Sequence, residues 1–333
     1  MKKCLISLFS LLCVFMLFVS CGKKAVKDDC GCFVDLEAAK SYAQKKNIPV
    51  LIVVTSEGDD ELSTDFVRNI LNAADFADKI GNKYAVYHAD FSAAAFAKTT
   101  AGENASKEER AAAEAYSLIM ENSYQNAIAL DVTLTPSAYV TTKDGYVVSE
   151  VEFGDNDVNL NSFAQLLESY TSKIQKFDVM VAATKKGSAS DKVEAIDTLY
   201  RATDSAYRSF LIDLVKKVPE LDKNNETGLC GKYIVAAADS NAMNYYSKGD
   251  LESALKEYLT AADNQFVKAE DKQECFYTAA YFVAYSGSDD FTAIIQYLNL
   301  AYQVAPESSK APAIKDAITY FETLAENSSS IEE

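Results

Sequence analysis

The chain has 333 residues, of which 49% are apolar and 24% are charged, and it contains 12 Gly and 5 Pro. This composition excludes a disordered or fibrous protein and predicts a globular one, whose length favours two domains. Asp and Glu number 49 against 32 Lys and Arg, and the net charge of −17 argues against nucleic acid as a partner. One His and no Trp argue against a multi-His metal centre and a Ser-His-Asp enzyme. We expect no cofactor, no metal and no catalytic residue.

Residues 1–20 have the features of a secretory signal, because two Lys precede an uncharged run that is short for a membrane span. The run ends at Phe18-Val19-Ser20-Cys21, which resembles a bacterial lipoprotein signal, with Phe18 where Leu is usual, as in spirochaete lipoboxes. The resemblance implies lipidation of Cys21, for example with palmitate. The protein would then sit in the cell envelope, lipid-anchored on the periplasmic or outer surface of a membrane. An ordinary signal peptide cut elsewhere and an uncleaved anchor are the alternatives.

Residues 21–34 are expected to form a lipid-anchored tether that carries Cys30-Gly31-Cys32. This spacing could hold a strained, easily reduced disulfide or bind a soft metal ion, so Cys30 and Cys32 are candidate redox or metal residues. The alternative is a pair of linker thiols, one of them bridged to Cys230 or Cys275. The sequence alone does not fix the connectivity of these four cysteines.

Residues 35–175 alternate helical and strand patterns and predict an α/β domain. A helix over 35–46 leads into the apolar run Val50–Val54, typical of a strand buried on both faces. The next helix opens with Asp59-Asp60-Glu61, acids that we interpret as helix caps. His88 lies in a strand over 84–89, and we interpret it as a strand-end side chain rather than a base. A hairpin over 137–152 and a final helix complete the domain.

The stretch Val132-Thr133-Leu134-Thr135-Pro136-Ser137, followed by a strand and the Lys143-Asp144-Gly145 turn, resembles the cis-proline segment and terminal hairpin of the thioredoxin fold. The resemblance implies a cis bond at Pro136 and a groove beside Thr135 and Pro136, in which redox-active relatives bind extended chains. Those relatives carry Trp-Cys-x-x-Cys after the central strand, where this chain has residues 57–62 without Cys or Trp. A thiolate nucleophile is therefore excluded at that position. An Ala-rich insertion from Phe91 to Asn122 is a second departure.

Residues 176–327 lack strand signals and predict an all-α domain, followed by a disordered tail at 328–333. Tyr245, Ala254, Tyr258 and Ala261 recur 40 residues later as Tyr285, Ile294, Leu298 and Ala301. This pattern resembles the tetratricopeptide repeat, which implies stacked pairs of antiparallel helices. Aromatic residues at helical spacing are core or interface, and Tyr246, Tyr277 and Tyr281 are the candidates for an exposed, partner-binding concave side.

Two hypotheses follow from these patterns. The first is a non-enzymatic, lipid-anchored envelope protein whose redox-inactive thioredoxin-like domain and helical repeats bind another envelope protein or peptide. The second is a thiol-disulfide oxidoreductase, or a partner of one, that acts through Cys30 and Cys32. The missing Cys-x-x-Cys pair favours the first hypothesis.

Overall fold

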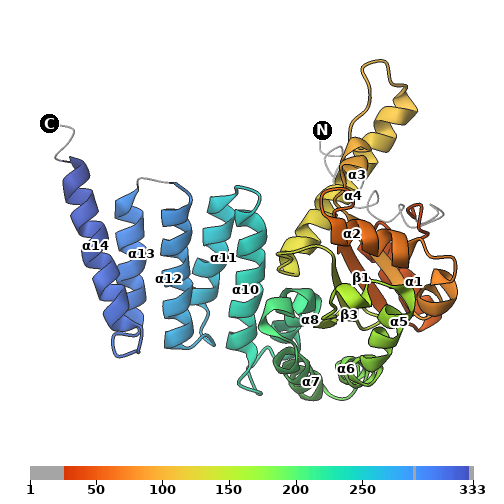
Figure 1. Cartoon of the computed structure of the whole chain (residues 1–333). Coiled ribbons are helices and arrows are strands. Elements are labelled where there is room, and N and C mark those ends of the chain that lie inside the picture. Colours follow the sequence, from red (N-terminus) through yellow and green to blue (C-terminus); the bar gives the residue numbers. More distant parts are fainter. Residues whose placement is uncertain (1–25, 288–289, 330–333) are drawn as a thin grey trace, which may run out of the picture. The chain divides into compact units, whose positions relative to one another are not determined.

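A computed structural model describes residues 26–287 and 290–329 (Figure 1). The predicted signal, Cys21 and the last four residues lie outside these ranges. The chain divides into two compact units, one formed mainly by residues up to 169 and the other mainly by residues from 170 onward. Of the helices within the described ranges, none is both long and apolar enough to cross a membrane.

The strands form one mixed four-stranded sheet with the order β2-β1-β3-β4, whose first three strands in that order lie in the first unit. The strands are β1 (Val50–Thr55), β2 (Ala85–Asp90), β3 (Ser137–Thr141) and β4 (Val147–Glu150). β1 pairs in parallel with β2 and antiparallel with β3. All six β1 side chains are buried, which confirms the expected strand with two covered faces.

Short helices surround this sheet, and their ends agree with the capping residues in the sequence. In α1 (Leu36–Lys46) the Asp35 carboxylate accepts a hydrogen bond from the Ala38 amide at 2.9 Å, and Asn47 ends the helix at a φ of 55°. Phe66 and Phe163, whose ring centroids lie 5.0 Å apart, form part of the core. The remaining helices are α2 (Glu61–Phe66) with its π-helical extension η1 (Val67–Leu71), η2 (Ala77–Gly81), η3 (Asp155–Asp157) and α5 (Leu160–Ser169).

The predicted insertion forms a helical hairpin of α3 (Ala93–Ala97) and α4 (Lys107–Ala129). Figure 1 shows this hairpin extending away from the sheet. Most side chains in the first half of α4 are exposed, with Ala113 an exception. The hairpin therefore contributes surface rather than core to the first unit.

The structure corrects the expected tether, because residues 26–34 pack against the sheet. The Phe33 amide donates to the Val86 carbonyl at 2.8 Å, and the Phe33 carbonyl accepts from the His88 amide at 2.9 Å. Cys32 and Phe33 are buried. We call residues 26–34 the N-terminal arm. Burial of these two side chains and pairing with the edge of β2 explain why the arm is not a free linker.

The second unit is helical. Its helices are α6 (Thr171–Ala183), α7 (Ala189–Ala202), η4 (Ser205–Leu211), α8 (Ile212–Val215), α9 (Val218–Leu221), α10 (Cys230–Tyr246), α11 (Leu251–Asp263), α12 (Ala269–Tyr285), α13 (Phe291–Val304) and α14 (Ala311–Ser329). Helices α10 to α14 lie side by side in chain order, each packed on the next (Figure 1). The chain is thus a mixed α/β unit joined to a helical one.

The repeated pattern of the second unit is largely a core pattern. Six of its eight positions are buried where α11 and α13 meet their neighbours: Ala254, Tyr258, Ala261, Ile294, Leu298 and Ala301. The first position of each set is different, because Tyr245 and Tyr285 are exposed. The Ala side chains at three of the buried positions let adjacent helices approach closely, and Tyr258, Ile294 and Leu298 fill the core between them.

Candidate functional site

A hydrogen-bonded network joins the loop after β1 to the loop that holds Pro136. The Ser56 and Thr135 hydroxyls lie 2.5 Å apart, and each donates to the Asp60 carboxylate, at 2.8 and 2.9 Å. Asp60 also accepts from the Ser63 amide at 2.5 Å and so caps α2, as the sequence predicted. The Thr135–Pro136 bond is cis, the geometry that the resemblance implied. The network joins the β1–α2 loop to the cis-proline loop through hydroxyl and carboxylate groups alone.

The Asp60 carboxyl is held in its charged form. Burial raises its pKa, but hydrogen bonds from Ser63, Ser56 and Thr135 outweigh burial and hold the pKa below its ordinary value. A carboxylate of this kind is a weak general base at neutral pH, because its pKa lies far below the working pH. The network therefore fixes two loops and offers no nucleophile.

Loss of the Asp60 carboxylate is expected to destabilise the α/β unit by about 1 kcal/mol or more at pH 7, since a helix cap and two hydroxyl contacts are lost together. Because the pKa of Asp60 is lower in the folded state than in the unfolded state, its carboxylate stabilises the fold at any pH above the unfolded pKa of about 3.9. This stabilisation is lost as the pH falls through the lower pKa of the folded state. Urea unfolding of Asp60→Ala should thus approach the parent curve only in strong acid. The exposed neighbour supplies the control, Asp59→Ala, and an equal loss in both variants would contradict the assignment.

His88 is not a strand-end side chain, which corrects the sequence interpretation. It lies within β2, is only 5% exposed, and bonds through both ring nitrogens. Nε2 is 2.8 Å from the Thr55 hydroxyl, and Nδ1 is 2.7 Å from the Asp28 carboxylate in the N-terminal arm. This order of groups is that of a hydrolytic triad, but Thr55 is fully buried and closed to any substrate. We interpret these two hydrogen bonds as a structural link that holds the N-terminal arm against the sheet.

Cys30 and Cys32 are free thiols, as are Cys230 and Cys275, so the disulfide alternatives are not realised in this structure. Burial and the carboxylate of Asp28 raise the pKa of both arm thiols, that of Cys30 to about 12. The Cys30 thiol contacts the Asn72 side chain at 3.1 Å. In the part of the chain that the structure describes, no cluster of three or more His, Cys, Asp and Glu side chains is placed to hold a metal ion.

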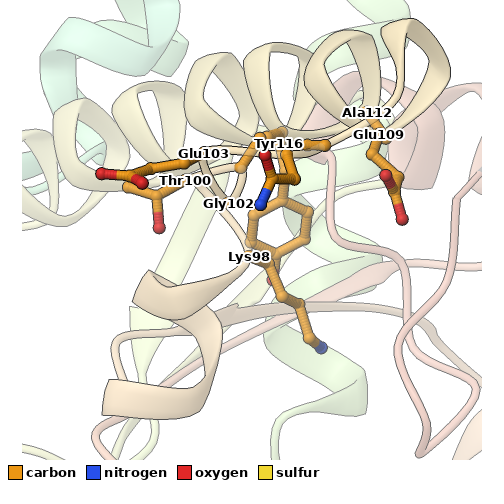
Figure 2. Close-up of a pocket in the computed structure, with 11 residues that line it drawn as sticks. Lys98, Thr100, Gly102, Glu103, Glu109, Ala112 and Tyr116 are labelled. Atoms are coloured by element: carbon orange, nitrogen blue, oxygen red, sulfur yellow. The ribbon is translucent and has the colours of Figure 1, made fainter.

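A pocket that the sequence did not predict lies in the helical hairpin. Its volume is about 760 Å³, and it is bounded by the α3–α4 loop and the first turns of α4. Figure 2 shows the Lys98 side chain beside the Tyr116 ring and the Glu103 and Glu109 carboxylates pointing away from each other. The Lys98 ammonium lies 5.7 Å from the Tyr116 ring centroid. The pocket opens broadly to solvent, and its polar groups do not converge on one point.

The predicted partner-binding tyrosines lie on α10 and α12, and the structure separates them. Tyr281 is 48% exposed, whereas Tyr246 and Tyr277 are partly buried against the helical core, which corrects the expectation that all three are exposed. The sequence missed Tyr285, which is 67% exposed and stacks on Tyr281 with ring centroids 4.1 Å apart. The signal that could have found it is the spacing of four residues, which places both rings on one face of α12.

We define the tyrosine face as Tyr246, Tyr277, Tyr281 and Tyr285. A hydrogen bond with Tyr285 raises the pKa of Tyr281, and the phenols of Tyr277 and Tyr246 raise it further. Tyr246 packs on the helical core, with its ring centroid 4.4 Å from that of Phe282. Tyr281 and Tyr285 are exposed to solvent. An exposed stacked pair above a packed base is a rigid aromatic surface.

Comparison with known proteins locates relatives without assigning an activity. Residues 229–327 match a family model described as "Uncharacterised protein C-terminal domain". A Treponema pallidum (strain Nichols) protein named "Uncharacterized protein" is 27% identical over 130 residues, which cover 39% of this chain and 43% of that protein. A solved structure titled "DsbH Oxidoreductase" is 11% identical with a TM-score of 0.31, over 46% of this chain and 87% of that one. Likeness at that level transfers no activity to this chain.

Proposed function

We propose that this protein is a non-enzymatic, lipid-anchored component of the cell envelope that binds another protein or peptide. In this proposal the α/β unit is a thioredoxin-like domain without redox activity, and the helices from α10 onward are tetratricopeptide-like repeats. The observation that carries the proposal is the exposed Tyr281–Tyr285 stack on α12. Tyr is one of the residue types enriched at the energetic hot spots of protein interfaces.

The non-enzymatic part is supported by the chemistry of the α/β unit. Asp60, Ser56 and Thr135 bond to one another, and the thiols of the arm have raised pKa values. Thiol exchange needs a thiolate, and a pKa of about 12 leaves a thiolate fraction on the order of 10⁻⁵ at pH 7. Such thiols are poor nucleophiles in the folded protein.

Alkylation of Cys30 by iodoacetamide should therefore be slow at pH 7 and should accelerate about tenfold for each pH unit up to about pH 11. The measurement uses a variant in which the other cysteines are Ser, followed by mass spectrometry over time. The same variant in urea is the control, because an unfolded thiol reaches its maximal rate near pH 9. A plateau near neutral pH in the folded protein would instead favour the thiol oxidoreductase hypothesis.

The proposal is tested by photocrosslinking in the organism's own envelope. A benzoylphenylalanine placed at position 281 should give a discrete adduct, while the same probe at Tyr320, a 60% exposed residue of α14, should not.

Fractionation of the same cells tests the anchor. Cys21→Ser should abolish signal processing and move the protein out of the detergent phase, because one sulfur carries the proposed lipid.

Two results would contradict the proposal. Equal adducts from positions 281 and 320 would show that exposure alone, and not the tyrosine face, determines capture. Unchanged detergent partitioning of Cys21→Ser would remove the lipid anchor.

A further inference from the structure

Three cationic side chains gather in the second unit, in a chain with a net charge of −17. Arg201 ends α7, Arg208 lies in η4, and Lys232 lies in the first turn of α10. We call these three residues the cation cluster. Two of them lie against the Tyr200 ring: the Arg208 guanidinium lies 4.7 Å from its centroid and the Lys232 ammonium 5.3 Å from it. Cations held over aromatic faces are partly desolvated and fixed in direction.

The protein holds the Arg201 guanidinium through Nε, and it holds that of Arg208 both through Nε and through the Tyr200 side chain. Arg201 contacts the Asp197 carboxylate through Nε at 2.7 Å, and its side chain is 67% exposed. Arg208 donates from Nε to the carbonyls of Tyr200 and Thr203, at 3.2 and 3.3 Å. The Nη edge of Arg201 is open to solvent and can meet a ligand, whereas Arg208 is half-buried and also bonds the Tyr200 side chain. A guanidinium edge of this kind binds the two oxygens of a carboxylate or phosphate in parallel.

The negative groups facing the cluster do not neutralise it. Asp197 bonds Lys232 at 2.6 Å as well as Arg201, and it accepts from the Tyr233 hydroxyl at 2.9 Å. Burial raises the Asp197 pKa, but the bonds from Lys232 and Tyr233 outweigh burial and keep it low, so the group stays charged. Asp239 is the second carboxylate that acts on Tyr200. Asp197 is shared by Arg201 and Lys232, so one negative charge faces two positive ones that internal contacts already order.

We propose that the cation cluster is a binding site for an oxyanion, the carboxylate or phosphate group of a ligand. Arg201 supplies the forked donor, Arg208 and Lys232 supply positive charge, and Asp197 positions Arg201 and Lys232. This site is separate from the tyrosine face, and it stands whether or not that face binds a partner.

The composition of the chain allows a direct test, since it has only four arginines, at 68, 110, 201 and 208. The full chain labelled with ¹⁵N-arginine gives one Nε–Hε signal for each. Titration with sodium phosphate or sodium acetate, at an ionic strength kept constant with sodium chloride, should shift the signals of Arg201 and Arg208 saturably. Arg68 and Arg110, which lie in the α/β unit, are internal controls. Saturation by phosphate, by acetate or by both supports the site and identifies its anion.

Variants separate a built site from a charged surface. Arg201→Gln should weaken binding about tenfold, because one charge-assisted fork is lost. Arg201→Lys keeps the charge without the fork and should recover only part of the affinity. Arg68→Gln, which removes a cation from another salt bridge, should change nothing. The proposal is overturned if neither anion shifts Arg201 and Arg208, if all four signals move in parallel, or if Arg201→Gln binds like the parent.

Discussion

Alanine at position 231 is expected to disrupt the helical unit, because α10 approaches the 264–267 loop through a glycine. A Cβ on Gly231 would lie 2.0 Å from the Phe266 carbonyl oxygen and 2.6 Å from its carbon. Both atoms are backbone, so no side-chain rotation relieves the overlap, and α10 or the loop must move. Overpacking a core typically lowers the free energy of unfolding by about 1–3 kcal/mol. Because this contact is very short and is made with backbone, we expect a loss of about 3 kcal/mol or more.

Urea unfolding followed by circular dichroism measures this loss, as a shift of more than about 1 M in the transition of the helical unit. Gly102→Ala is the matched control, because a Cβ there meets nothing within 4 Å. It should leave both transitions within about 0.5 kcal/mol of the parent. If Gly231→Ala unfolds like Gly102→Ala, the close approach of α10 to the loop is not present in solution.

Truncation of Tyr281 is expected to cost about 2 kcal/mol of partner binding, roughly thirtyfold in the dissociation constant. Its ring is exposed and held by the Tyr285 stack, so binding would bury it without ordering a mobile side chain. The captured partner of position 281 supplies the ligand for the measurement, by surface plasmon resonance with the purified chain. Because Tyr281 is half exposed, its substitution should change the free energy of unfolding by no more than about 0.5 kcal/mol, so the melting temperature should hardly fall.

Two further variants separate interface from core. Tyr320→Ala removes a comparably exposed ring on α14 and should leave the affinity unchanged. Tyr258→Ala removes a buried ring and should lower the melting temperature by a core-sized amount. The tyrosine face is not the binding surface if Tyr281→Ala loses stability like Tyr258→Ala while the affinity of the remaining folded protein stays the same.

Local patterns in the sequence predicted much of the fold. The unbroken apolar run of β1, the cap at Asp60 and the buried positions of α11 and α13 depend on neighbours within a few residues, and each was found where expected. The α/β and helical halves followed from the change in periodicity. The domain boundaries, the site residues and the lipid anchor stay predictions.

The missed features depend on contacts between distant residues. Asp28 and His88 are 60 residues apart in the sequence, and the residues around each of them do not predict their hydrogen bond. Asp197 and Lys232 are 35 positions apart, so the cation cluster is visible only once α7 and α10 are placed together. The tyrosines were misjudged for a related reason, since helical spacing shows that Tyr277 and Tyr281 share a face but not which of them the neighbouring helix covers.

The packed N-terminal arm shortens the distance available between the fold and its proposed anchor. Because Val26 already belongs to the described structure, only five peptide steps separate it from Cys21. A chain of that length reaches at most about 16–18 Å when fully extended. With Cys21 in the bilayer surface, Val26 at the start of the arm would stay within that distance of the lipid headgroups. The α/β unit would then stay close to the membrane surface, because its connection to the lipid is short.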